Sequence, residues 1–240
     1  MEKGTGACVA VITARGGSKR IPNKNIKVFC GKPILAYSIL AALESGVFDE
    51  VIVSTDNKKI AQTAVLYGAA VPFLRSAENS GDYATTADVL LEVCDAYTHT
   101  RGPLERICCI YPTAPFVTAA RLSQAMELLR CPETESVIPV VRFGDPPQRG
   151  LLMENGSVRY WMPEYERARS QDLPVVYHDC GQFYCIKTAA LKKYRSLITP
   201  NCKAIVIPDT QAQDIDNPDD WKLALLKYKL FAKGEGACRT

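Results

Sequence analysis

The chain has 240 residues, of which 47% are hydrophobic and 23% charged, a length and composition that suit one large globular domain or two small ones. Its 29 basic and 26 acidic residues leave a net charge of only +3, so general binding of nucleic acids is not expected. The sequence has no signal-peptide pattern, and no apolar run reaches the ~18 residues of a membrane-spanning helix, so we expect no membrane association.

The cysteines show no metal-binding pattern. None of the ten cysteines forms a C-x-x-C pair, and only His99 and His178 could complete a cluster, so a zinc site is not expected. Several cysteines, such as Cys108 and Cys109, lie in apolar runs and are expected to be buried free thiols. Free thiols without an export signal predict a protein of the reducing cytoplasm.

The first part of the chain alternates between predicted strands and helices. In chain order we expect a strand at Cys8–Ile12, a helix at Ile34–Glu44, a strand at Val51–Ser54, a helix from Asn57 to about Tyr67 capped by Thr55-Asp56, a short strand at Val71–Leu74, a helix from Thr85 to about Tyr97, a strand at Arg106–Tyr111 and a helix at Thr118–Arg130. This order predicts an α/β fold with a mostly parallel sheet and helices on both faces. Ligands bind such sheets beyond the carboxyl ends of the strands.

Beyond residue 135 the pattern is less regular. We expect a strand at Ser136–Val141, a hairpin of Leu151–Met153 and Ser157–Trp161 with an Asn155-Gly156 turn, a strand at Gln182–Ile186, a helix at Thr188–Tyr194, a strand at Ala204–Ile207, a helix from Asp219 to about Ala232, and a frayed tail from Lys233 to Thr240. The insert at about 142–180 predicts a functional loop or a subunit contact within a single domain of residues 1–240.

A basic, glycine-containing loop follows the first predicted strand. It runs from Ala14 to Asn25 and includes Arg15, Gly16, Gly17, Ser18, Lys19, Arg20 and Lys24. Backbone N–H groups of such a turn can cradle phosphate oxygens, and Arg and Lys can hold them by charge. Neither the dinucleotide fingerprint nor a P-loop is present, so an exposed charged turn is the alternative.

Two aspartates stand two residues apart near the end of the chain. In an extended segment, Asp214 and Asp216 project to the same side, and Mg²⁺ bound to substrate phosphates commonly takes one or two such carboxylates. Capping of the following helix is the alternative.

Two further groups of polar residues carry weaker signals. Thr85 and Thr86 could cap a helix, or could contact a base or ribose together with Arg75. Adjacent residues of a strand face opposite ways, so the His178-Asp179 pair favours substrate hydrogen bonding over a catalytic pair. No motif for nucleophilic catalysis occurs.

Taken together, these segments resemble the CMP-sialic acid synthetase family, the acylneuraminate cytidylyltransferases. The resembling blocks are Ala14–Pro22 with Lys24-Asn25, Ser54–Asp56, Leu74-Arg75, Tyr111–Pro115 and Asp214–Asp216, in the family's order. They cover about Val9 to Leu225. Within the family, Arg169–Leu173 and Tyr177–Tyr184 resemble the pseudaminic acid cytidylyltransferase branch.

The resemblance implies a Rossmann-like nucleotide-diphospho-sugar transferase fold and a CTP-dependent reaction. The anomeric hydroxyl of a nonulosonic acid sugar attacks the α-phosphate of CTP, and the products are a CMP-sugar and pyrophosphate. Implied nucleotide contacts are Ala14, Arg15, Gly16, Gly17, Ser18, Lys19, Lys24, Asn25, Arg75, Ala84 and Thr86. The implied catalytic residues are Arg15 and Lys19, which hold the triphosphate, and Asp214 and Asp216, which hold Mg²⁺.

The resemblance also implies sugar contacts and a homodimer. Implied sugar contacts are Tyr111, Arg169, Gln171, His178, Gln182 and Tyr184, with Arg169 placed for the sugar carboxylate. Family members are homodimers in which the insert, here about 142–180, crosses to the partner subunit.

Two positions depart from the family pattern. Tyr111 stands where sialic acid synthetases usually carry Gln beside the sugar, which argues against N-acetylneuraminate, and Asn23 replaces a basic residue of the pseudaminic branch. A CMP-N-acetylneuraminate or CMP-legionaminate synthetase, an enzyme for another nucleotide and an inactive nucleotide-binding module remain alternatives. The general base also stays open between His178, a metal-bound water and the carboxylates of Asp214 or Asp216.

Overall fold

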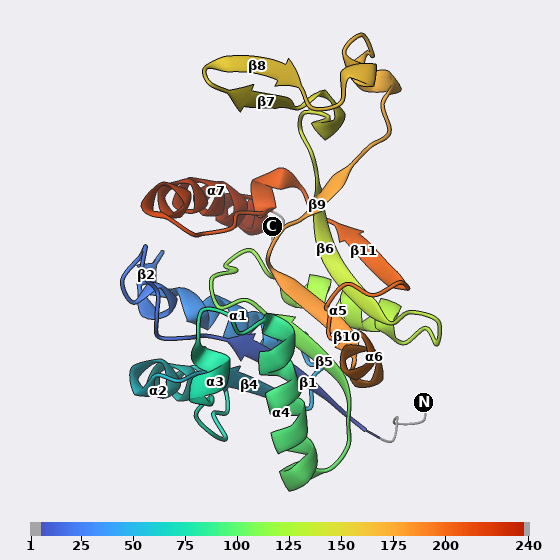
Figure 1. Cartoon of the computed structure of the whole chain (residues 1–240). Coiled ribbons are helices and arrows are strands. Elements are labelled where there is room, and N and C mark those ends of the chain that lie inside the picture. The colour runs from blue at the N-terminus through green and yellow to red at the C-terminus, as the bar shows by residue number, and fades with distance from the viewer. Residues whose placement is uncertain (1–5, 238–240) are drawn as a thin grey trace.

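A seven-stranded sheet forms the centre of the protein (Figure 1). The computed structural model describes residues 6–237. Its strands are β1 (Ala7–Thr13), β4 (Glu50–Ser54), β5 (Leu104–Ile110), β6 (Ser136–Arg142), β9 (Tyr177–Asp179), β10 (Phe183–Lys187) and β11 (Cys202–Val206). Their order is β11-β6-β10-β5-β1-β4, and β9 pairs with β6. Strand β1 is parallel to β4 and β5, whereas β10 lies antiparallel between β5 and β6. The sheet is therefore mixed but mostly parallel around β1.

Helices bury both faces of this sheet. On one face, α1 (Ile34–Ser45), α2 (Lys58–Leu66) and α5 (Ala119–Leu129) pack over Ala10 and Ile12 of β1. On the other face, α4 (Thr86–Arg101) and α6 (Thr188–Tyr194) pack over Val9 and Val11. Because neighbouring residues of β1 point to opposite faces and both faces are covered, the strand is apolar from Ala7 to Ile12. The α/β fold predicted from the sequence is confirmed.

The C-terminal helix packs against the segment that follows the basic loop. Helix α7 (Pro218–Ala237) shares an apolar cluster with β2 (Val28–Phe29), which forms a short hairpin with β3 (Lys32–Pro33). The rings of Phe29 and Trp221 meet edge to face with their centroids 5.5 Å apart. Ile215 is buried in the same cluster. The segment at residues 28–33 and the C-terminal helix are thereby held side by side.

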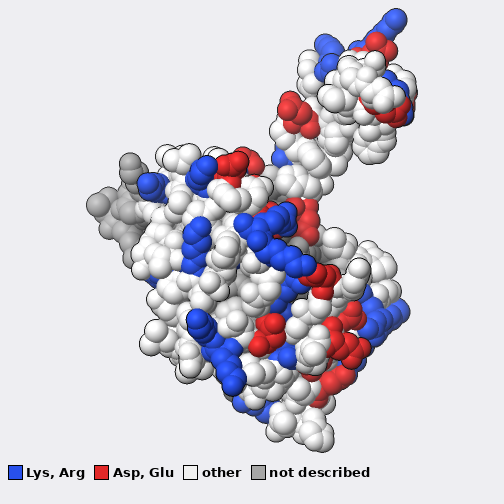
Figure 2. Space-filling model, turned by 60° about the vertical axis from the view of Figure 1, so that its left-hand side comes forward, with Lys and Arg blue, Asp and Glu red and all other residues white. Residues whose placement is uncertain are grey.

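An arm of about residues 142–180 stands clear of the body (Figures 1 and 2). It carries the hairpin of β7 (Leu151–Glu154) and β8 (Ser157–Tyr160), whose turn at Asn155 and Gly156 has the positive φ angles of 51° and 81° that such a turn requires. The remaining short helices are α3 (Ala77–Ser80) and the 3-10 turns Lys24–Ile26, Pro147–Arg149, Pro163–Tyr165, Ser170–Asp172 and Asp209–Gln211.

Two local predictions were wrong. Residues 71–74 do not form a strand; only Ala70 makes an isolated bridge, to Ile52, since Pro72 lacks the N–H that would continue the pairing. Helix α7 runs to Ala237 instead of ending near Ala232, so the expected frayed tail is helical over its first part, and residues 238–240 lie outside the described residues. Within residues 6–237, none of the helices has both the length and the apolar character needed to cross a bilayer.

Candidate active site

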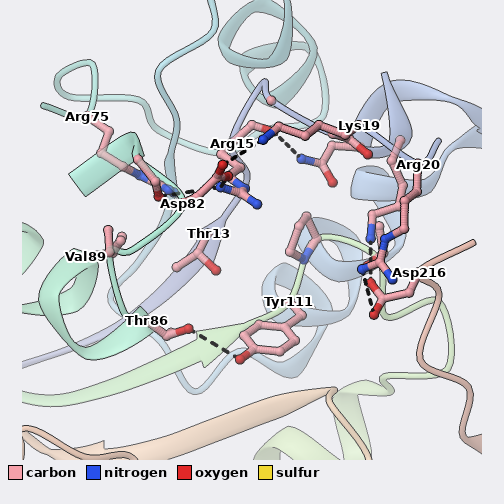
Figure 3. A pocket seen from close by; sticks show the side chains of 18 of the residues that line it. Thr13, Arg15, Lys19, Arg20, Arg75, Asp82, Thr86, Val89, Tyr111 and Asp216 are labelled. Carbon is pink, nitrogen blue, oxygen red and sulfur yellow. Dashed lines mark hydrogen bonds and ion pairs between the residues drawn. The ribbon is translucent and has the colours of Figure 1, made fainter. Parts of the chain in front are cut away.

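A pocket of about 550 Å³ opens at the carboxyl ends of β1 and β5 (Figure 3). Its walls come from the basic loop, the segment between α3 and α4, the residues after β5 and the segment that precedes α7. Of the residues predicted from the sequence, the lining includes Arg15, Gly17, Ser18, Lys19, Lys24, Asn25, Arg75, Ala84, Thr86, Tyr111, Asp214 and Asp216. Residues far apart in sequence therefore meet where an α/β sheet is expected to bind its ligand.

Close packing against the start of α2 fixes the basic loop. The N–H of Gly16 donates to Asp56 Oδ1 at 2.7 Å, and a Cβ at Gly16 would lie 2.8 Å from the side-chain amide of Asn57. Asn57 caps α2, in place of the predicted Thr55-Asp56, because its Oδ1 accepts from the Lys59 and Ile60 N–H groups. Gly16 is therefore needed for close packing against Asn57, and its N–H is already hydrogen-bonded to Asp56. Gly17, in contrast, faces open space.

The two cations assigned to the triphosphate share one carboxylate. Arg15 lies 2.9 Å from Asp82 Oδ1, and Lys19 lies 2.7 Å from Asp82 Oδ2. The hydrogen bonds from Lys19 and then Arg15 lower the pKa of Asp82, so this carboxyl stays ionised. Figure 3 shows Arg15 and Asp82 on one side of the pocket and Arg20 with Asp216 on the other.

A buried arginine, Arg75, forms another part of the pocket wall. Arg75 is only 7% exposed, and its guanidinium donates to the hydroxyl of Ser54 at 3.0 Å and to the Ser54 carbonyl at 2.5 Å. Burial lowers the pKa of Arg75, an effect opposed by the nearby Asp56. A guanidinium held this firmly at the end of β4 is suited to directional hydrogen bonding of a polar ring edge.

The two carboxylates before α7 enter the pocket from the opposite side. Asp216 lies 3.1 Å from Arg20 and 3.5 Å from Lys24. Asp214 keeps a solvent-accessible edge, but burial by its surroundings raises the pKa of its carboxyl, and the nearby Asp216 raises it further. Ile215 between them points into the core, so the predicted alternation is confirmed.

Other residues perform the capping that was the alternative role for these aspartates. The side chain of Asn217 accepts from the N–H groups of Asp219 and Asp220, and the Asp220 carboxylate accepts from those of Asp216 and Asn217. Likewise Thr85 caps α4 with Asp88, which leaves Thr86 to line the pocket. The side chains of Asp214 and Asp216 therefore do not cap α7, and both line the pocket.

The donor set fits Mg²⁺ but not a closed protein-only metal site. No group of three or more His, Cys, Asp or Glu side chains that could hold a metal occurs in the part of the chain that the structure describes. Two neighbouring carboxylates, of which Asp214 has a pKa raised by burial and then by the charge of Asp216, favour a divalent cation whose remaining ligands are phosphate oxygens and water.

Comparison with known proteins identifies the family of this fold and pocket. A family model described as "Cytidylyltransferase" matches residues 9–149, which include the basic loop, Arg75 and Tyr111. The chain belongs to the cytidylyltransferase family. It is 37% identical to the pseudaminic acid cytidylyltransferase of Campylobacter jejuni over 92% of this chain and 96% of that protein.

Two further similarities extend this result. The chain is 41% identical to N-acylneuraminate cytidylyltransferase A of Danio rerio over 93% of this chain and 52% of that protein. Its fold matches a structure of CMP:2-keto-3-deoxy-manno-octonic acid synthetase complexed with CTP, with a TM-score of 0.68, 17% identity and coverage of 95% and 99% of the two chains. The Rossmann-like nucleotidyltransferase fold expected from the sequence is thus confirmed.

Tyr111 forms the part of the cytidylyltransferase pocket that lies over β10. Its hydroxyl lies 3.3 Å from that of Thr86, and its ring centroid is 5.3 Å from that of Tyr184. Tyr184 is buried behind it and donates to Asp179 Oδ2 at 2.6 Å. Gln182 is also buried and donates to the Gln211 carbonyl. Gln182 and Tyr184, predicted as sugar contacts, therefore support the wall and do not line the pocket of this chain.

The other predicted sugar contacts lie on or beside the arm. Arg169 forms a bidentate ion pair with Asp172, with distances of 2.7 and 3.1 Å. The ring of His178 packs against Phe143, with centroids 4.7 Å apart. Neither residue lines the pocket of its own chain, nor does Gln171, and Ala14 is fully buried beneath the basic loop. Their binding roles stay predictions.

Sequence reasoning missed several pocket residues. Arg20 was predicted only as one of the phosphate-binding cations of the basic loop, and its pairing with Asp216 was not foreseen. Asp82 received no predicted role, although it lines the pocket and pairs with Arg15 and Lys19. Thr13, Asn79, Gly81, Val89, Pro112 and Thr113 complete the lining. The family block at Tyr111–Pro115 was a signal for Pro112 and Thr113, whereas no sequence signal connects Asp82 with the basic loop.

Proposed function

We propose that the protein transfers CMP from CTP to the anomeric hydroxyl of a nonulosonic acid, specifically pseudaminic acid, with release of pyrophosphate. The observation that carries this proposal is the meeting of a basic loop and two carboxylates in one pocket of a cytidylyltransferase-family fold. The cations suit a triphosphate, and the carboxylates suit the metal that accompanies it.

The nucleotide would lie across the basic loop. Arg15 and Lys19 hold the outer phosphates, and the open backbone at Gly17 lets phosphate oxygens approach closely. The cytidine occupies the side of the pocket formed by Arg75, Ala84 and Thr86, where the Ser54 contacts hold the guanidinium in one orientation. Rigid donors of this kind favour one base over another because a mismatched base leaves them unpaired.

Asp214 and Asp216 would hold Mg²⁺ together with phosphate oxygens. When bound there, the metal neutralises charge that develops on the phosphates during the attack. Lys24 and Arg20 flank Asp216 and orient its carboxylate towards the pocket. His178 lies outside the pocket of its own chain, so a metal-bound water and the carboxylates of Asp214 or Asp216 are the remaining candidates that the sequence offered for the general base.

The choice of pseudaminic acid rests on Tyr111 and on similarity to a named relative. The Campylobacter jejuni relative is a pseudaminic acid cytidylyltransferase and aligns over nearly its full length. The Danio rerio relative is named for N-acylneuraminate, so that sugar is a rival, as is legionaminic acid. Tyr111 presents a ring and a hydroxyl to the pocket where sialic acid synthetases usually carry Gln.

The arm supports a proposed homodimer. Leu151, Met153, Val158 and Trp161 are more than half exposed on a two-stranded hairpin that stands clear of the body. Such a hairpin gains stability when its apolar side chains are covered. A second copy would cover them and could bring Arg169 of its own arm to the sugar. The free thiols from Cys8 to Cys202 support a reducing compartment such as the cytoplasm.

One assay with several sugars tests the proposal. Purified protein, CTP and Mg²⁺ are mixed with pseudaminic, legionaminic or N-acetylneuraminic acid, and pyrophosphate release and the product mass are measured. We expect CMP-pseudaminic acid to form fastest. Turnover with N-acetylneuraminate alone would contradict the sugar assignment, and no turnover with any of these sugars would contradict the enzymatic function.

A further inference from the structure

Asp82 is paired with both cations that the proposed function assigns to the phosphates of the substrate. Its two carboxylate oxygens bind the two side chains assigned to the triphosphate, Arg15 at 2.9 Å and Lys19 at 2.7 Å. A carboxylate that bridges two cations imitates a phosphate group, because both present paired anionic oxygens to the same donors. An incoming triphosphate therefore has to replace Asp82 on Arg15 and Lys19.

The segment around Asp82 is anchored on both sides. On one side, Ser76 and Asn79 of the α3 region donate to the carboxylate of Glu92 on α4. On the other side, Thr85 and Asp88 form a capping box at the start of α4. The flanks are thus part of the folded body, and they place Asp82 reproducibly opposite the basic loop.

Between these anchors the loop is free to let Asp82 leave. Residues 81–84 belong to no helix or strand, and Tyr83 next to Asp82 is 99% exposed. Both ion pairs of Asp82 are themselves accessible to solvent, with 80% of the Lys19 side chain exposed. Exposed ion pairs exchange partners at small free-energy cost.

We propose that Asp82 is a specificity-determining residue that competes with phosphate for Arg15 and Lys19. The proposal rests on the function proposed above and deepens it. Only a ligand that brings several negative charges replaces the carboxylate effectively, so Asp82 disfavours orthophosphate and other weakly charged anions. Asp82 also retakes both cations when pyrophosphate leaves, which weakens retention of that product.

Pyrophosphate binding to the whole protein tests this proposal without the sugar. The affinity of inorganic pyrophosphate is measured by calorimetry in metal-free buffer for wild type, Asp82→Asn and Asp82→Glu. A matched control is Asp95→Asn, since Asp95 is an exposed α4 carboxylate, paired with Lys192 at 3.6 Å, and its change removes the same charge outside the nucleotide pocket.

We expect Asp82→Asn to bind pyrophosphate roughly three- to tenfold more tightly than wild type, because two exposed ion pairs no longer compete. The pyrophosphate affinity of Asp95→Asn should equal that of wild type. The affinity of Asp82→Glu, which keeps the negative charge, should lie closer to wild type than that of Asp82→Asn. A folding defect would weaken binding, so the expected tightening separates competition from a structural role. In turnover, Asp82→Asn should show stronger inhibition by pyrophosphate.

Two results would overturn the proposal, and they are distinguishable. If wild type binds pyrophosphate and forms CMP-sugar but Asp82→Asn binds no more tightly, the competitive role of Asp82 is wrong and the proposed function stands. If wild type binds neither pyrophosphate nor CTP, Arg15 and Lys19 are not a phosphate site, and both proposals are wrong.

Discussion

Lys24 connects the basic loop to the carboxylate segment at the opposite end of the chain. Its ammonium donates to the main-chain carbonyl of Ile215 at 2.6 Å and lies 3.5 Å from Asp216, across a sequence separation of 191 residues. Only 18% of the Lys24 side chain is exposed. The contact holds two halves of one site together, and it leaves less of Lys24 available to the nucleotide than the sequence suggested.

Replacing Lys24 should destabilise the protein as well as the site. Lys24→Met keeps the length of the side chain but leaves the Ile215 carbonyl without this charged donor, which should lower the free energy of unfolding by about 1–3 kcal/mol. Urea denaturation measures the loss. Lys58→Met, at an exposed position of α2, is the control, and equal stability of the two variants would show that the Lys24 contact is not structural.

The neighbouring glycines of the basic loop should respond differently to alanine. A Cβ at Gly16 would lie 3.0 Å from Asn57 Cβ, so Gly16→Ala should disturb the α2 cap and cost about 1–3 kcal/mol of stability. Gly17→Ala meets nothing within 4 Å and should be close to neutral. Thermal melting compares the two variants, and similar losses would mean that the loop does not depend on this contact.

The ionised carboxylate of Asp214 should lower the free energy of unfolding at neutral pH. Its pKa is raised in the folded state, so ionising it there is unfavourable relative to the unfolded chain. This loss of folding free energy is at its maximum when the pH is above the folded-state pKa of Asp214. It disappears when the pH is below the ordinary Asp pKa of 3.8. Asp214→Asn should therefore raise Tm modestly at pH 8, the gain shrinking as the pH falls towards 3.8. A gain that grows in acid would contradict this assignment.

Local sequence patterns predicted most helices and strands, because these elements depend mainly on residues that are close together in the sequence. The apolar run at residues 8–12 and the Asn-Gly turn of the arm depend on neighbouring residues, and both were predicted. The position of β10 between β5 and β6 was not, because strand order depends on pairing between distant segments. The strand predicted at residues 71–74 failed because apolar character was given more weight than Pro72.

The sequence predicted the site residues that belong to recognisable motifs. It did not predict those that join the site only through contacts between distant parts of the chain. Arg15, Lys19, Asp214 and Asp216 lie in motifs and meet in the pocket as expected. Asp82 joins Arg15 across 67 residues through an ion pair that no local pattern encodes. Arg169 and Gln171 lie outside the pocket of their own chain, so their proposed sugar contacts would require the arm of a second copy, whose position a single sequence does not specify.

Tyr111 should govern the choice of sugar more than the affinity for CTP. Tyr111→Gln removes the ring from the pocket, and we expect kcat/KM for pseudaminic acid to fall roughly tenfold or more. Tyr111→Phe keeps the ring and loses the contacts of the hydroxyl with Thr86 and Tyr184, so its effect should be smaller. Steady-state kinetics with each substrate varied separates the two effects. A larger change in the KM for CTP would place Tyr111 in the nucleotide site instead.

The central claim is that the basic loop and the carboxylates before α7 form one metal-dependent site for CMP transfer. The most direct measurement compares Mg²⁺-dependent formation of CMP-pseudaminic acid by Asp216→Ala and by Asp219→Ala, a control at an exposed carboxylate paired with Lys222. We predict a loss of at least about 100-fold for Asp216→Ala, with a cooperative thermal transition retained, and near wild-type activity for Asp219→Ala. Near-normal activity of Asp216→Ala would contradict the account.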